Sequence, residues 1–148
     1  MNTHPYWRAF MAASVVPTLF TLVVLSGFIV ARFVFQIPVA LERVIVFPMA
    51  LVPNLFGVWN MFYLWLGPQR HLPLGFHGAL LPFILAPAGY ALATCLGFLT
   101  LGHEGLVWFH AIAVPYPLFA TGFLFALVVY YLVWKHFVGF FNQVLGIA

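Results

Sequence analysis

Four long runs of apolar residues constrain this chain more than any other feature of its sequence. The runs cover about residues 12–35, 44–66, 75–101 and 113–135, and breaks with polar residues, Gly or Pro separate them. Each run is long enough to cross a hydrocarbon layer of about 30 Å as an α-helix. The sequence therefore predicts an all-α membrane protein, a bundle of four transmembrane helices with short loops, as a single transmembrane domain over residues 1–148.

The composition agrees with a lipid environment. The chain is 66% hydrophobic and 5% charged, against roughly 45–50% and about 25% in soluble domains, so water could not solvate its surface. Transmembrane strands are the alternative, because Val, Ile, Phe and Tyr are abundant. Such strands alternate apolar and polar residues over short segments, whereas these runs are apolar on every side. Helices in a lipid bilayer are expected.

The first apolar run superficially resembles a signal peptide, because a short polar start with Arg8 precedes it. The stretch from Ala9 to Ala31 exceeds the roughly 7–15 residues of a signal-peptide core, and no small-residue cleavage motif follows. We expect this run to be retained as the first span.

The basic residues predict an orientation in the membrane. An even number of spans places both termini on one side, with the loops near Gln36 and Glu104 on the other. Three basic residues then share the side of the termini and two lie opposite: Arg8, Arg70 and Lys135 against Arg32 and Arg43. The positive-inside rule favours cytoplasmic termini, in a membrane of the bacterial inner-membrane type. The charges form no basic patch, so nucleic-acid binding is not expected.

Small residues at four-residue spacing are candidates for helix packing, because lipid gives helices no hydrophobic reason to associate and close approach must supply the energy. The third span carries Gly89, Ala93 and Gly97 in one stripe; the first carries Gly27 and Ala31, and the fourth Gly122 and Ala126. Chance spacing is the alternative. The eighteen phenylalanines exceed what such a bundle can enclose, so many must face lipid or another protein.

Several single residues have simple structural interpretations. Asn54 and Asn60 in the second span each predict an interhelical hydrogen bond, with a substrate or quinone contact as the alternative. Cys95 has no partner cysteine and is expected to be a buried small apolar residue. Trp7, Trp65 and Trp134 are expected near the cytoplasmic interface, where the amphipathic indole is favoured.

Six histidines are the residues most able to carry chemistry. Neutral imidazole binds haem iron and can exchange protons near a quinone. His77 and His136 fall on the side of the termini and could hold a b-type haem between them. His110 falls on the opposite side and cannot share an iron with either, and His77, His110 or His136 could instead contact quinone. No His-x-x-x-His pair is present, and His103 and His110 would lie about 10 Å apart along a helix, so a metal ion is not expected.

The sequence contains no nucleophile with a base and no Gly-rich phosphate loop, which argues against enzymatic chemistry. The leading hypothesis is a non-catalytic small subunit or anchor that associates with other membrane protein subunits or with itself. The first alternative is a redox subunit that binds b-type haem or quinone. The second is a small transporter, which would have to be oligomeric because four helices with so few polar residues hardly line a path.

Overall fold

Three helical stretches are long and apolar enough to cross a membrane in the computed structural model, which describes residues 4–38, 51–67, 72–97, 99–108 and 112–147. These stretches are Pro5–Phe33, Leu74–Cys95 and Tyr116–Val144. The second expected span is represented by helix α3 (Val52–Leu66), which has 15 residues. Residues 44–50 of that span lie outside the described residues. A membrane-spanning, mostly helical chain is confirmed, and a four-span bundle is not.

Helix α1 (Pro5–Phe33) begins with a proline, which suits the first turn because its missing N–H needs no partner there. Arg8 and Arg32 lie near its two ends with no charged residue between them. The 24 residues that separate them correspond to about 36 Å along the axis. This distance covers the hydrocarbon layer of about 30 Å and leaves both guanidinium groups near a polar interface.

The third stretch is broken into helix α4 (Leu74–Ala79) and helix α5 (Pro82–Cys95). The break falls just before Pro82, whose ring cannot donate a backbone hydrogen bond. Helix α5 ends at Cys95 rather than at residue 101, and Gly97 follows with a positive φ of 76°. Glycine adopts this conformation without strain at a helix end. Cys95 is exposed, so the prediction that it is buried is wrong.

A small antiparallel sheet replaces the short loop expected before the last span. It has the order β1 (Leu99–Leu101), β2 (Gly105–Trp108) and β3 (Ile112–Pro115). The register pairs Thr100 with Val107 and Val107 with Ala113. The prediction of an all-α protein is therefore wrong in this segment. Strands β1 and β3 form the edges of the sheet, and open edges are not tolerated in hydrocarbon, so the sheet belongs outside the hydrocarbon layer.

The last helical stretch runs through helix α6 (Tyr116–Leu132), the π-helical segment η2 (Val133–Val138) and helix α7 (Gly139–Val144). It begins at Tyr116 rather than at residue 113, because residues 112–115 form strand β3. It continues to Val144, beyond the expected end at residue 135. Lys135 therefore lies within the helical stretch and not at its end.

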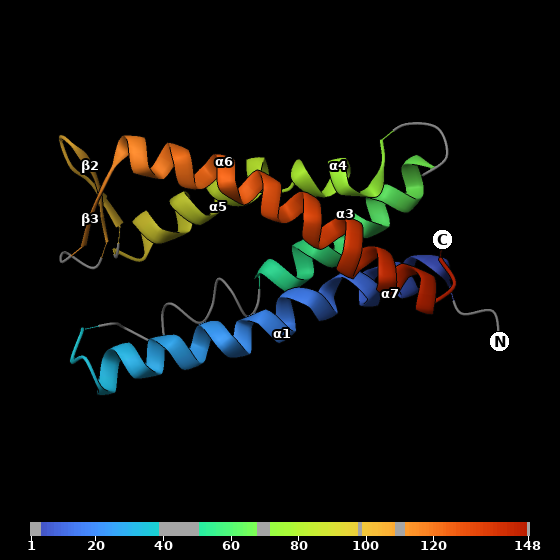
Figure 1. Ribbon diagram of the computed structural model, residues 1–148, viewed down its shortest axis with the longest axis horizontal. Coiled ribbons are helices and arrows are strands. Elements are labelled where there is room, and N and C mark those ends of the chain that lie inside the picture. Colours follow the sequence, from blue (N-terminus) through green and yellow to red (C-terminus); the bar gives the residue numbers. More distant parts are fainter. Residues whose placement is uncertain (1–3, 39–50, 68–71, 98, 109–111, 148) are drawn as a thin grey trace.

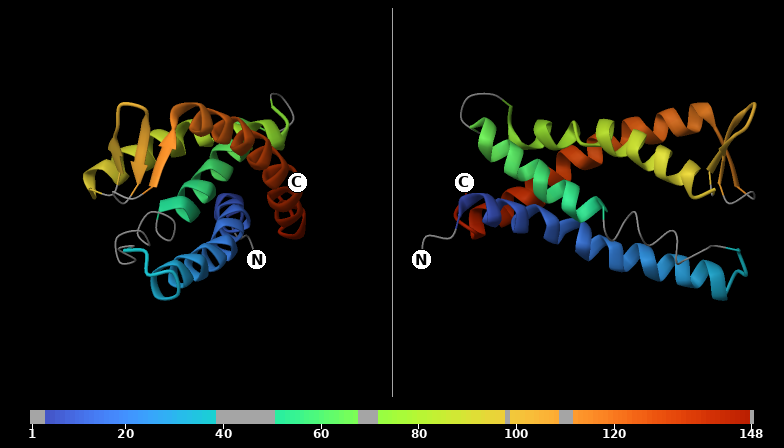
Figure 2. Two further views of the ribbon diagram at one scale, coloured as in Figure 1. Left: turned by 60° about the vertical axis from the view of Figure 1, so that its left-hand side comes forward. Right: turned by 180° about the vertical axis from the view of Figure 1, so that it is seen from behind.

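The two termini lie at one end of the molecule and the sheet lies at the other (Figure 1). We call these the terminal end and the sheet end. Helices α1 and α6–α7 approach each other at the terminal end and diverge toward the sheet end, as two further views confirm (Figure 2). The side of the membrane that the terminal end faces stays a prediction.

Candidate functional site

Helix α4 places His77 against Trp59 of helix α3 in a reciprocal contact. The two rings stack with their centroids 4.8 Å apart and an angle of 21° between their planes. Trp59 Nε1 donates a hydrogen bond to the His77 carbonyl oxygen at 2.9 Å, and His77 Nε2 lies 3.1 Å from the Trp59 carbonyl oxygen. Because a carbonyl oxygen only accepts, Nε2 is the donor and carries the proton. The pair ties α4 to α3.

Further aromatic rings enclose this histidine, which is only 2% exposed. Its ring centroid lies 5.0 Å from that of Tyr63, 6.1 Å from Phe62 and 6.0 Å from Trp134. We call the set His77, Trp59, Phe62, Tyr63 and Trp134 the aromatic cluster. It joins α3, α4 and η2.

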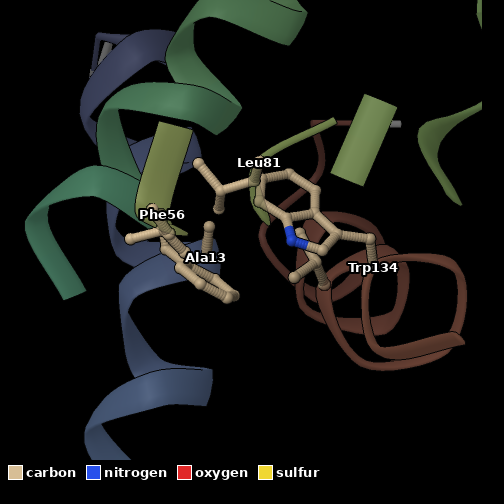
Figure 3. Close-up of a cluster of buried hydrophobic side chains, with 6 residues drawn as sticks. Ala13, Phe56, Leu81 and Trp134 are labelled. Carbon is tan, nitrogen blue, oxygen red and sulfur yellow. The ribbon is translucent and has the colours of Figure 1, made fainter. Parts of the chain in front are cut away.

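Trp134 fits into a notch at Gly78, where any side-chain carbon would overlap the indole. The residue is fully buried by protein, so its indole does not face lipid, and its depth in the membrane stays a prediction. Its indole belongs to a core cluster that also contains Ala13, Phe56 and Leu81 (Figure 3). Its Nε1 group has no hydrogen-bond partner among the residues that the structure describes. The shape of the notch, and not a polar contact, therefore fixes this tryptophan.

The structure places the predicted haem ligands in different surroundings. His77 is buried with its Nε2 bonded to a carbonyl oxygen, whereas His136 is exposed on η2. Trp134, two residues before His136, occupies the inner face of η2 beside His77. His110 lies outside the described residues. Binding of b-type haem or quinone by these histidines stays a prediction.

A buried amide pair connects three helices near the termini. Asn60 Nδ2 donates to the Ala9 carbonyl oxygen and to Asn142 Oδ1, both at 2.8 Å, and Asn142 Nδ2 donates to Asn60 Oδ1 at 3.3 Å. The side chains are 1% and 2% exposed. The predicted interhelical hydrogen bond of Asn60 is confirmed. Its partner Asn142 was not predicted, because the fourth span was expected to end before it.

A groove of about 620 Å³ opens on the side of the molecule between α1 and the α6–η2–α7 stretch, a volume typical of ligand sites. We call it the lateral groove. Its α1 wall is formed by Val16, Pro17, Leu19, Phe20, Thr21, Val23 and Val24, its opposite wall by Val129, Tyr130, Val133, Phe137 and Phe141, and its floor by Val52 and Phe56 of α3. The lining is almost wholly apolar.

Two of the predicted packing motifs continue the walls of the lateral groove toward the sheet end. Gly27 follows Val24 by three residues on α1, and Ala126 precedes Tyr130 by four on α6, so each motif shares the helical face of its wall. At Gly27 and at Gly122 no atom of another described element lies within 4 Å of the position that a Cβ atom would take. We call the Gly27–Ala31 and Gly122–Ala126 faces the open faces.

The third predicted packing motif, Gly89, Ala93 and Gly97, does not border the lateral groove. Ala93 is buried and packs with Leu99 and Leu106 of the sheet. Gly97 lies in the turn after α5, and Gly89 is half-buried on that helix. A helix–helix seam along this stripe stays a prediction.

Comparison of the chain with models of protein families, with curated proteins and with solved structures finds no match.

Proposed function

We propose that the protein is a non-catalytic membrane subunit, which binds a membrane-spanning helix of another protein along the two open faces. The observation that carries the proposal is that no described neighbour occupies the space beside Gly27 or Gly122, one glycine on each face. Helix α6, with 17 residues, has no buried residue at all. In lipid, an exposed stripe of small residues is the surface that lets a second helix approach closely.

The use of the interior polar groups supports a non-catalytic role. The Trp59 indole N–H and the His77 imidazole bond to each other's backbone carbonyl oxygens. The Asn60 and Asn142 amides bond to each other and to the backbone of α1. Polar groups that hydrogen-bond to one another hold the helices together and are not available to a substrate.

The charges support an orientation with cytoplasmic termini in a membrane of the bacterial inner-membrane type. Among the described residues, Arg8 lies near the start of α1 and Lys135 in η2, whereas Arg32 lies in the last turn of α1, at its opposite end. The positive-inside rule then assigns the terminal end to the cytoplasm and the sheet to the opposite side. A partner helix along the open faces would lie in the half of the bilayer nearer the sheet.

A crosslinking scan in cells tests this function. A photoreactive amino acid is placed at each position from 118 to 128 of α6, and adducts with another protein are measured. We expect yields that peak at Gly122 and Ala126 and fall between them, as one helical face requires. Gly122→Leu should remove the adduct formed from position 126. Ala120→Leu, about 200° around the helix from Gly122, should leave it.

Equal yields at all positions would contradict a specific partner helix. An adduct that forms only with a second copy of this chain would change the partner to self-association. Survival of the adduct in Gly122→Leu would remove the small-residue face from the account.

A further inference from the structure

We propose that the lateral groove retains one acyl chain of a membrane phospholipid. The inference is independent of the proposed partner helix, because it concerns the part of the α1–α6 space near the terminal end. There the walls carry bulky side chains and α3 closes the floor. The open faces lie farther toward the sheet end.

The chemistry of the groove favours hydrocarbon over water. Of its described lining residues, only Thr21 and Tyr130 have polar side chains. The Thr21 hydroxyl donates to the Pro17 carbonyl oxygen at 2.7 Å. A bound water needs about two to four polar partners, which this lining does not offer. Both walls belong to stretches that can span a membrane, so the medium at the groove mouth is lipid.

The shape of the groove favours a chain over a helix. Phe20 and Phe137 stand on opposite walls, and Phe56 lies on the floor between them. A helix with its side chains is about 10–12 Å across and approaches closely only at small residues. A flexible acyl chain can pass between bulky side chains and make dispersion contacts on several sides at once. A flat helix surface contacts a lipid chain on one side only.

The length of the walls is also suited to an acyl chain. The α1 wall extends from Val16 to Val24, about 12 Å along the helix axis, and the opposite wall extends from Val129 to Phe141, about 18 Å. Both walls belong to stretches that can cross the bilayer, as acyl chains do. The groove can therefore hold a long stretch of one chain.

Adjacent valines on α6 give a matched test. Val129 lines the groove, whereas Val128 is 55% exposed and does not line it. The purified chain is measured by native mass spectrometry in a mild detergent. We expect about one retained phospholipid in the wild type and in Val128→Trp. Val129→Trp, which narrows the groove, should reduce the retained fraction about tenfold, equivalent to about 1.4 kcal/mol.

A second pair on the opposite wall guards against misfolding of one variant. Val24→Trp should act like Val129→Trp, and Leu22→Trp, at an exposed position outside the groove, should act like the wild type. Circular dichroism reports whether each variant keeps its helices. In phosphatidylcholine vesicles that contain a diazirine-bearing acyl chain, photolabelling should concentrate on the groove walls and fall in the same two variants.

Three outcomes would overturn the inference. One is equal phospholipid retention in the groove variants and their controls. Another is a retained quinone or other non-phospholipid in place of the phospholipid. The last is a wild-type dimer that Val129→Trp converts to a monomer, which would make the occupant a second copy. Because the purified chain is measured alone, failure of the partner-helix scan leaves this test unaffected.

Discussion

The helices of this protein become more apolar toward the sheet end, yet α1 is joined to the α6–η2–α7 stretch near the terminal end, through η2 and α7. At the terminal end the buried pair Asn60 and Asn142 joins three helices, and Trp134 fills the notch at Gly78. Toward the sheet end α1 diverges from α6 (Figure 1), and no described residue comes within 4 Å of the Cβ position at Gly27. The more apolar region is the less closely joined one, so hydrophobicity does not decide where these helices meet. Shape-matched notches and polar pairs decide it, as expected in lipid.

The largest effect is expected at the notch that holds Trp134. Gly78→Leu forces the indole out of the core, and we expect it to lower the free energy of unfolding by about 3 kcal/mol or more. Thermal unfolding in detergent measures the change. The control Gly122→Leu, made at an open face, should not destabilise the isolated protein, because Leu is a better helix former than Gly. Equal loss in both variants would erase the distinction between the two ends.

The next largest effect is expected at the amide pair. Asn60→Leu leaves the buried Asn142 amide and the Ala9 carbonyl oxygen without their partner, at a cost of about 1–3 kcal/mol. The double variant Asn60→Leu with Asn142→Leu should recover part of this loss. Gln143→Leu, at the adjacent exposed position, should have little effect. A tolerated Asn60→Leu would show that packing alone holds the terminal end.

A smaller effect is expected in the aromatic cluster. Trp59→Phe keeps a ring beside His77 but removes the indole N–H that donates to the His77 carbonyl oxygen. We expect a loss of about 1 kcal/mol in the free energy of unfolding. Trp65→Phe, at a position 67% exposed, is the control and should be neutral. A neutral Trp59→Phe would assign the contact to stacking alone.

The smallest expected change in the free energy of unfolding comes from Gly→Ala substitutions, and its sign should differ between the two ends. Gly27→Ala adds a methyl group to open space and removes a flexible residue from α1, so it should stabilise the isolated protein by up to about 1 kcal/mol. Gly57→Ala is the same change at the terminal end, where the Phe10 ring occupies the space, and should destabilise it. Unfolding curves of the two variants measured side by side decide the comparison. Changes of the same sign would contradict it.

The sequence located the membrane-spanning stretches because long apolar runs leave few alternatives. It missed the sheet because Leu99–Leu101 and Gly105–Trp108 are short, apolar and continuous with helical runs, so they carry no alternating pattern. The turn between them, which contains His103 and Glu104, looked like an ordinary loop between helices.

The interior contacts were harder to predict than the helices. Asn60 was expected to bond across helices, since an amide within a span needs a partner. The position of Trp134 depends on Gly78, more than fifty residues away in the sequence, and no local pattern signals that fit. His77 was singled out as a ligand, but its Nε2 bonds to a backbone carbonyl oxygen, and no side-chain pattern can predict such a partner. Residue types predict which segments are helical, but they do not predict how the interior side chains fit together.

The distance between α1 and α6 tests the central claim most directly. Spin labels on a Cys95→Ser background are placed at exposed positions in two pairs, Val30 with Leu118 at the sheet end and Met11 with Phe140 at the terminal end. Pulsed electron paramagnetic resonance then gives the distribution of distances between the two spin labels of each pair. For the isolated chain we predict a narrow distribution at the terminal end and a broad one at the sheet end, which narrows in the native complex. Equally narrow distributions at both ends of the isolated chain, unchanged in the complex, would contradict the account.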